Sequence, residues 1–212
     1  MTDKSSDLPP WESPDAAKTR PDWRDVSSEV VFSNPWIEVS RRDVIAPTGN
    51  PAHYGLVRFK NRAIAVLPLH DDGTVPLVGQ MRYPLGNFSW EIPEGGSPEG
   101  ESAVAGAKRE LLEETGLVAN EMYQILEMEL SNSVTDEVAV CFLATGLSQQ
   151  EAAPDDTERF EYARVPFPQV LEAVIKGQVR DALTVACVLR VHHMAVKGEL
   201  PPHLCTAVLG GQ

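Results

Sequence analysis

The chain has 212 residues, of which 42% are hydrophobic, and its formal net charge is -13. This length predicts one domain with a sizeable core, and the negative charge argues against a general affinity for nucleic acid or for an anionic membrane. No stretch reaches the about eighteen apolar residues of a membrane span, and the N-terminus lacks the apolar core of a signal peptide. Three cysteines without metal-ligand spacing indicate reduced thiols in a cytoplasmic protein.

The first half of the chain is predicted to be a leader followed by strands. Residues 1–26 are rich in Pro, Ser and charge without periodicity, which predicts a flexible leader. The turn residues Asn34 and Pro35 separate the first two predicted strands, and a hairpin at 71–74 joins the last two. The strands are predicted at 27–33, 36–45, 55–59, 63–69 and 75–83.

The second half alternates between predicted helices and strands. Gly95, Gly96 and Gly100 with Pro98 predict a tight loop; Glu101 and Ser102 then open a helix that ends before Gly116. Downstream we predict strands near 123–130, 138–144 and 160–167, a polar loop at 147–158, and helices near 167–176 and 181–197. This order predicts an α+β fold, a mixed sheet sandwiched between helices (α/β/α), as a single domain at 27–200 with a short tail at 201–212.

Three glutamates on the central predicted helix suggest a cation site. Glu110, Glu113 and Glu114 have the i, i+3, i+4 spacing that places side chains on one helix face. Each like-charge pair costs an isolated helix roughly 0.2–0.5 kcal/mol, so a cation or a basic partner is expected to offset the repulsion. Carboxylates suit Mg²⁺, Mn²⁺ or Ca²⁺, and Mg²⁺ keeps waters that substrate phosphates can replace. The alternative is a solvated helix face.

The surroundings of the glutamates resemble the Nudix box. Every position of that box is filled, by Gly95, Glu101, Arg109-Glu110-Leu111, Glu113-Glu114 and Gly116-Leu117. The resemblance implies that Glu110 and Glu114 are metal ligands and that Glu113 is a ligand or assists the attacking water. It also implies that Arg109 and Glu101 form a supporting pair, which can orient the ligands.

Two segments before the box narrow the substrate class. Gln80-x-Arg82 and Glu91-x-Pro93-Glu94-Gly95 resemble segments of the ADP-ribose and nucleoside-diphosphate-sugar pyrophosphatases. The resemblance implies that the backbone carbonyl of Glu94 completes the metal shell. Arg82 is expected to bind the diphosphate through its planar fork, or else to pair with a nearby acid at its strand end. Glu91 is expected to contact substrate or metal, or to fix the loop.

Three features outside these segments leave details open. The residue that accepts a proton from water is predicted in the acidic loop, as Glu158 with Asp156 as the second choice, and Glu113 is a further alternative. Residues 131–137 lack the Pro and Gly of the corresponding ADP-ribose segment, so a GDP-mannose-type specificity is the alternative. Asp181 lies in a turn that resembles that of the same pyrophosphatases and is predicted to cap a helix rather than to catalyse.

The resemblance therefore implies hydrolysis of the diphosphate of ADP-ribose or a related nucleotide sugar, giving a nucleoside monophosphate and a sugar phosphate. Mg²⁺ or Mn²⁺ is the only cofactor implied. The expected partner is a second copy of the chain, in a homodimer whose N-terminal strands at 27–60 cross over; no nucleic acid or membrane is expected. The alternatives are a GDP-mannose pyrophosphatase with little ADP-ribose activity and a non-catalytic sensor that binds ADP-ribose.

Overall fold

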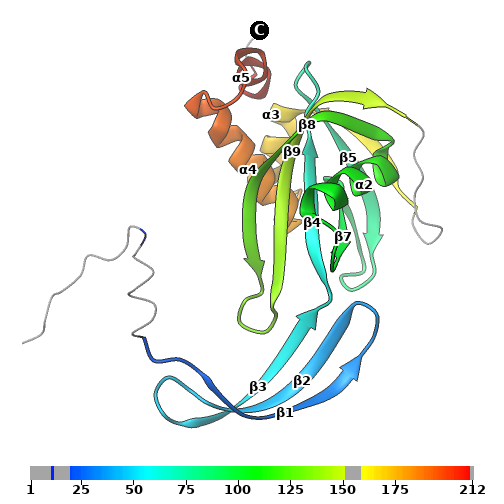
Figure 1. The fold of residues 1–212 in the computed structure, drawn as a ribbon. Helices are drawn as coiled ribbons and strands as arrows, with labels where there is room; N and C mark the ends of the chain where they lie inside the picture. The colour runs from blue at the N-terminus through cyan, green and yellow to red at the C-terminus, as the bar shows by residue number, and fades with distance from the viewer. Residues whose placement is uncertain (1–10, 12–19, 151–158, 211–212) are drawn as a thin grey trace, which may run out of the picture. The chain divides into compact units, whose positions relative to one another are not determined.

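The computed structural model describes residues 11, 20–150 and 159–210, which form two compact units, Met1–Arg58 and Phe59–Gln212 (Figure 1). No helix in these described ranges is both long and apolar enough to cross a lipid bilayer. In chain order the elements are β1 (Arg24–Ser33), β2 (Ile37–Ile45), β3 (Pro51–Phe59), β4 (Asn61–Pro68), β5 (Thr74–Arg82), β6 (Asn87–Glu91), β7 (Glu94–Pro98), α2 (Ala103–Thr115), β8 (Leu117–Leu130), β9 (Glu137–Gln149), β10 (Glu161–Pro166), α3 (Phe167–Ile175), α4 (Ala182–Lys197) and α5 (Pro202–Val208).

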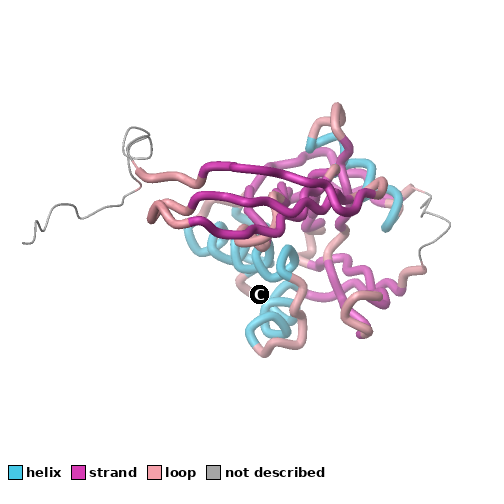
Figure 2. Tube along the Cα trace, turned by 90° about the horizontal axis from the view of Figure 1, so that it is seen from below, coloured by secondary structure: helices cyan, strands magenta, loops and turns pink. Residues whose placement is uncertain are grey.

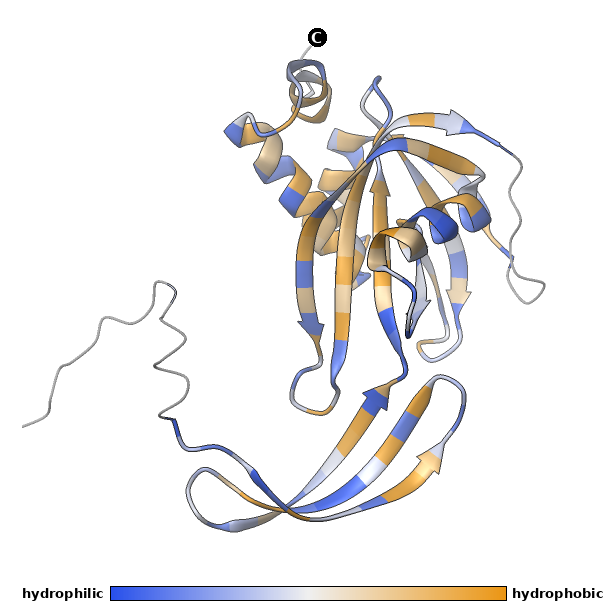
Figure 3. Cartoon of the chain, in the orientation of Figure 1, coloured by the Kyte–Doolittle hydropathy of each residue, from blue (hydrophilic) through white to orange (hydrophobic). Residues whose placement is uncertain are grey.

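The first unit is a three-stranded sheet in the order β1-β2-β3, visible as adjacent strands in Figure 2. The predicted turn at Asn34 is present, since the Asn34 side chain accepts hydrogen bonds from the backbone N–H groups of Trp36 and Ile37. Every residue of β1 is exposed, although the strand carries apolar side chains such as Val30 and Phe32. Figure 3 shows hydrophobic stretches, in orange, along this strand. This sheet therefore buries little apolar surface within its own unit.

The second unit confirms the predicted sandwich. Its four-stranded sheet has the order β7-β4-β9-β8, in which β4 and β9 are parallel and the other pairs are antiparallel. Alternate residues of β4 enter two separate cores, because side chains on a strand point to opposite faces. Ile64 and Val66 pack with α2, whereas Ala65 and Leu67 pack with α4. Figure 1 shows these two helices on opposite sides of the strands.

The glycine-rich segment before α2 differs from its prediction as a loop. Glu94–Pro98 is strand β7, which pairs antiparallel with Asn61–Ala65 of β4. Glycine disfavours a strand locally, but pairing with a distant strand outweighs this preference. The caps of α2 agree with the prediction, since Ser102 accepts a hydrogen bond from Ala105 N–H and Gly116 ends the helix at φ +69°.

Three further elements differ from their predicted extents. β6 (Asn87–Glu91) was not predicted and pairs with β5. β9 continues to Gln149, into the predicted polar loop, because it pairs along its length with β8, which begins at Leu117 rather than near 123. Helix α5 (Pro202–Val208) lies in the predicted tail and buries Leu204 and Val208.

Only Ile92 and Pro93 connect β6, in the sheet β10-β5-β6, to β7 in the four-stranded sheet. Both residues are held by hydrogen bonds across the unit. The N–H of Ile92 donates to Thr184 Oγ1 of α4 at 3.0 Å, and the carbonyl of Pro93 accepts from Val66 N–H of β4 at 2.8 Å. This two-residue connection places Glu91 and Glu94 at the junction of the two sheets.

Candidate active site

Helix α2 brings two of the box glutamates against consecutive residues of β7. Glu110 and Glu114 are 9% and 2% exposed, and Glu114 Oε2 accepts a hydrogen bond from Glu94 N–H at 3.3 Å. A Cβ at Gly95 would lie only 2.2 Å from Cδ of Glu110, so the close approach of this carboxylate requires glycine. The local reason for the arrangement is the helical spacing, which directs both side chains from one face of α2.

Arg109 holds the box together from the same helix. Its Nη1 donates to Glu110 Oε1 at 2.8 Å and to Glu113 Oε2 at 2.9 Å, and its Nη2 donates to the carbonyl of Gly96 at 2.8 Å. The guanidinium also pairs with Glu101, with 3.1 Å between Nη2 and Oε2. One cation therefore contacts three carboxylates and the β7 backbone, which fixes their positions relative to one another.

Strands β5 and β6 supply a second group of charged residues. The Nε and Nη2 atoms of Arg82 donate to Glu91 Oε2 at 3.0 and 2.6 Å, and Nη2 also contacts Glu94 Oε1. Glu91 is only 2% exposed, so the carboxylate of this ion pair lies out of solvent, whereas the Arg82 side chain is partly exposed. Arg82 thus pairs with nearby acids, which is one of the two roles expected for it from the sequence. Its side chain also lines a cavity.

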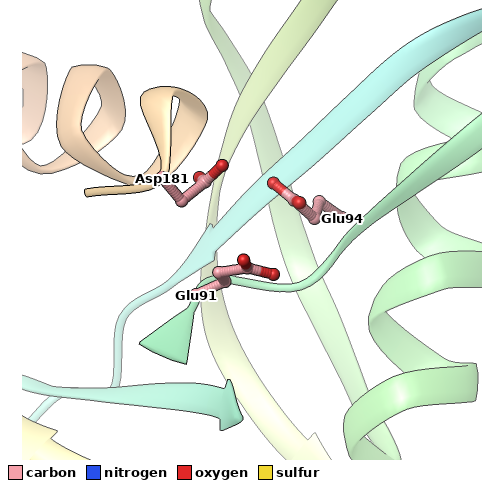
Figure 4. Close-up of side chains that lie close together, drawn as sticks. All are labelled: Glu91, Glu94 and Asp181. Atoms are coloured by element: carbon pink, nitrogen blue, oxygen red, sulfur yellow. The ribbon is translucent and has the colours of Figure 1, made fainter. Parts of the chain in front are cut away.

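Asp181 joins this second group from the N-terminus of α4. One carboxylate oxygen from each of Glu91, Glu94 and Asp181 lies within 4.8 Å of the others, and the three side chains point toward one another in Figure 4. The predicted cap is confirmed, because Asp181 Oδ2 accepts from Thr184 N–H at 2.7 Å. The sequence analysis did not predict that Asp181 lies beside Glu94. The sequence signal that could have suggested it was the presence of an aspartate in the turn into α4.

The side chain of Glu94 is strongly affected by these surroundings. Burial raises the pKa of its carboxyl well above the usual range, and the negative charge of Asp181 raises it further. A cavity of about 510 Å³ opens beside it. The residues that line this cavity include Arg82, Phe88, Glu91, Gln178, Arg180 and Asp181.

The predicted proton acceptors cannot be placed in the same way. Glu158 and Asp156 lie outside the described residues. Burial raises the pKa of Tyr162, near the start of β10, and the charge of Glu114 raises it further, so β10 starts within electrostatic reach of the box. The roles of all these residues stay predictions.

The comparisons with known proteins agree with this arrangement. The NUDIX domain family matches residues 59–185. An ADP-ribose pyrophosphatase of Bacillus subtilis (strain 168) is 34% identical over 161 residues, which cover 75% of this chain and 86% of that protein. An ADP-ribose pyrophosphatase of Mycobacterium tuberculosis (strain ATCC 25618 / H37Rv) is 28% identical over 87% of this chain and 90% of that protein.

The fold also matches a solved structure. The crystal structure of an ADP compounds hydrolase superposes with a TM-score of 0.76 and covers 84% of this chain and 97% of that one. The two sequences are 19% identical, so this likeness concerns the fold.

Proposed function

The chain belongs to the Nudix family of hydrolases, and on that premise we propose that it hydrolyses the diphosphate of ADP-ribose or a related nucleoside diphosphate sugar. The products would be a nucleoside monophosphate and a sugar phosphate. The observation that carries this proposal is that charged side chains from α2 and β5 converge on residues 94 and 95. Glu114 contacts the backbone of Glu94, Glu110 packs on Gly95, and Arg82 contacts the Glu94 side chain.

The residues around β7 fit a divalent metal ion. Their donors are carboxylate oxygens, the ligands that Mg²⁺ and Mn²⁺ prefer, and the missing Cβ of Gly95 leaves room for the Glu110 carboxylate. Glu110, Glu114 and the backbone carbonyl of Glu94 would hold the ion. When bound, it would neutralise diphosphate charge and lower the pKa of coordinated water.

The other residues have separate roles in this proposal. Arg82 binds a diphosphate oxygen, Glu91 orients Arg82 through their two-point contact, and Glu113 positions the metal or the attacking water. Arg109 and Glu101 keep the ligands in place. Glu158, which lies outside the described residues, accepts the proton from water.

We further propose that the enzyme is a cytoplasmic homodimer. The exposed apolar side chains of β1 support a partner surface, because a small sheet without a covered face is marginally stable in water. The thiols of Cys141, Cys187 and Cys205, which form no disulfide, support the location. Exchange of residues 27–60 between subunits is part of the same proposal.

The function is tested by Mg²⁺-dependent phosphate release in a coupled phosphatase assay. The substrates are ADP-ribose, GDP-mannose, UDP-glucose, a dinucleoside polyphosphate, coenzyme A and NADH. We expect turnover of ADP-ribose, GDP-mannose or both, and a loss of at least ~100-fold in Glu114→Gln, because changes in the outer shell alone cost 10–100-fold.

The matched control is Glu199→Gln, an acid-to-amide change at an exposed pair with Arg190, which should leave turnover unchanged. A folded parent that cleaves nothing in the panel but binds ADP-ribose would contradict the proposal and favour the sensor.

A further inference from the structure

The carboxylates of Glu91, Glu94 and Asp181 form a group separate from the box carboxylates. In the β4–β7 register, Glu94 pairs with Ala65 and Gly95 pairs with Ile64. Ala65 belongs to the core on the α4 side and Ile64 to the core on the α2 side. Because neighbouring strand residues point to opposite faces, the Glu94 side chain faces α4, whereas Gly95 faces Glu110 on α2. The backbone of β7 therefore lies between the two acidic groups.

The charges of this group do not balance. Glu91, Glu94 and Asp181 contribute three carboxylates, and the guanidinium in contact with them is that of Arg82. Arg180 lines the same cavity but forms no ion pair with any residue that the structure describes. When all three carboxylates are ionised, as metal ligands must be, they exceed the charge of Arg82 by two, which equals the charge of one divalent cation. Such an excess is costly where the carboxylates are buried.

A second observation points to a missing ligand. Glu94 Oε2 is buried and accepts no hydrogen bond from any described part of the chain, while Oε1 of the same carboxylate contacts Arg82. A buried polar oxygen without a partner is costly, so a ligand is expected to occupy the space beside it. Asp181 accepts the Thr184 N–H through Oδ2 and offers one carboxylate oxygen to the group.

We propose that Glu91, Glu94 and Asp181 bind a second divalent cation, Mg²⁺ or Mn²⁺, on the α4 side of β7 and apart from the box. Three carboxylates are too few for the 6–8 oxygen ligands of Ca²⁺ but suit a Mg²⁺-type ion that keeps several waters. The three carboxylates line the cavity of about 510 Å³ that Arg180 also lines. The ligand class that would complete the shell there is an anion with hard oxygens, such as a phosphate group. This site goes beyond the proposed function and does not depend on it.

The test counts bound metal ions in the full-length protein. Mn²⁺ is titrated into the protein, and free Mn²⁺ is measured by its electron paramagnetic resonance signal. We expect Asp181→Asn and Glu94→Gln each to bind one Mn²⁺ fewer per chain than the parent. Asparagine keeps the helix cap of α4, and glutamine keeps the shape and the backbone carbonyl of residue 94. The acid-to-amide control Glu199→Gln should bind as many ions as the parent.

A double variant separates the new site from the box. We expect Asp181→Asn combined with Glu114→Gln to lose more Mn²⁺ than either single change. The proposal is overturned if the folded Asp181→Asn and Glu94→Gln proteins bind the parental number of ions with parental affinity, or if the double variant loses no more than Glu114→Gln. Should Asp181→Asn fail to fold, Glu94→Gln decides. Turnover of ADP-ribose is measured separately, so its absence would count against the proposed function and not against the ion count.

Discussion

Gly95 shows how a single missing side chain positions a catalytic group. Its ideal Cβ would lie 2.2–2.4 Å from the carboxylate atoms of Glu110, so one of the two groups has to shift. The Gly95 backbone pairs with Ile64 in β4, so the strand cannot shift away without breaking the sheet. The carboxylate would therefore have to move.

We expect Gly95→Ala to reduce kcat about 100-fold, because a displacement of about 1 Å at a reacting group costs that much. Overpacking should also lower the free energy of unfolding by about 1–3 kcal/mol. Steady-state turnover of ADP-ribose and urea unfolding measure the two effects. Gly55→Ala is the control, since a Cβ there meets nothing within 4 Å. Parental turnover in Gly95→Ala would refute the role given to this contact.

At the scale of residues, the sequence predicted the glutamates of the box but not which distant residues lie beside them in the fold. Glu110 and Glu114 were predictable because helical spacing is a local property of the chain. Asp181 was predictable only as a cap, which is also local. That it lies beside Glu94 depends on how α4 packs against the sheet that contains β7, and no spacing within either segment encodes that. The same holds for Arg82, whose contact with Glu91 comes from the pairing of β5 with β6 and whose contact with Glu94 reaches the neighbouring sheet.

At the scale of elements, the hairpin between β4 and β5 is tied to β10 by one carboxylate. Asp72 Oδ1 accepts hydrogen bonds from the backbone and the hydroxyl of Thr74, and its Oδ2 pairs with Arg164 of β10 at 2.7 Å. The hydrogen bond from the Thr74 side chain, with help from Arg164, lowers the pKa of Asp72 to about 2.

We expect Asp72→Ala to lower the free energy of unfolding by less than about 1 kcal/mol at pH 7, since water screens this exposed pair. A carboxylate with a lowered folded pKa stabilises fully above its unfolded value of 3.8 and loses this effect as the pH falls through about 2. The difference from the parent should therefore shrink between pH 4 and pH 2 in urea titrations. A constant difference would contradict this origin, and Asp71→Ala, whose 3.6 Å contact with His203 is longer, is the neighbouring control.

The elements themselves were predictable to different degrees. α2 has a capping serine, an apolar stripe and a terminal glycine, and β4 has a continuous apolar run, so both were found. β7 contains two glycines and a proline, and β6 is only five residues long. Each is a strand because a distant partner supplies hydrogen bonds, which local propensity does not report. α5 begins at Pro202, directly after Pro201, and was hidden by its shortness.

At the scale of the whole molecule, the first unit has apolar side chains on a strand with no buried residue. If these side chains contact a second copy of the chain, charge introduced there should separate the copies. We expect Val30→Lys combined with Phe32→Lys to turn a dimer into a monomer and to lower turnover, because the exchanged strands would no longer complete the partner's site.

Light scattering after size-exclusion chromatography, at several protein concentrations, measures the mass. Thr48→Lys combined with Asn50→Lys adds the same charge near the β2–β3 turn and should leave the mass unchanged. A parent that elutes with the mass of one chain would refute the homodimer.

The two-residue connection at Ile92 and Pro93 has a consequence for altering this enzyme. Both residues are hydrogen-bonded across the unit, and carboxylates from both sheets flank them, so this joint leaves little freedom for rotation of one sheet against the other. Directed evolution of specificity should therefore succeed through the loops, where backbone changes are tolerated. Libraries that diversify residues 91–95 should yield mostly unfolded chains, which makes this stretch the part to hold constant.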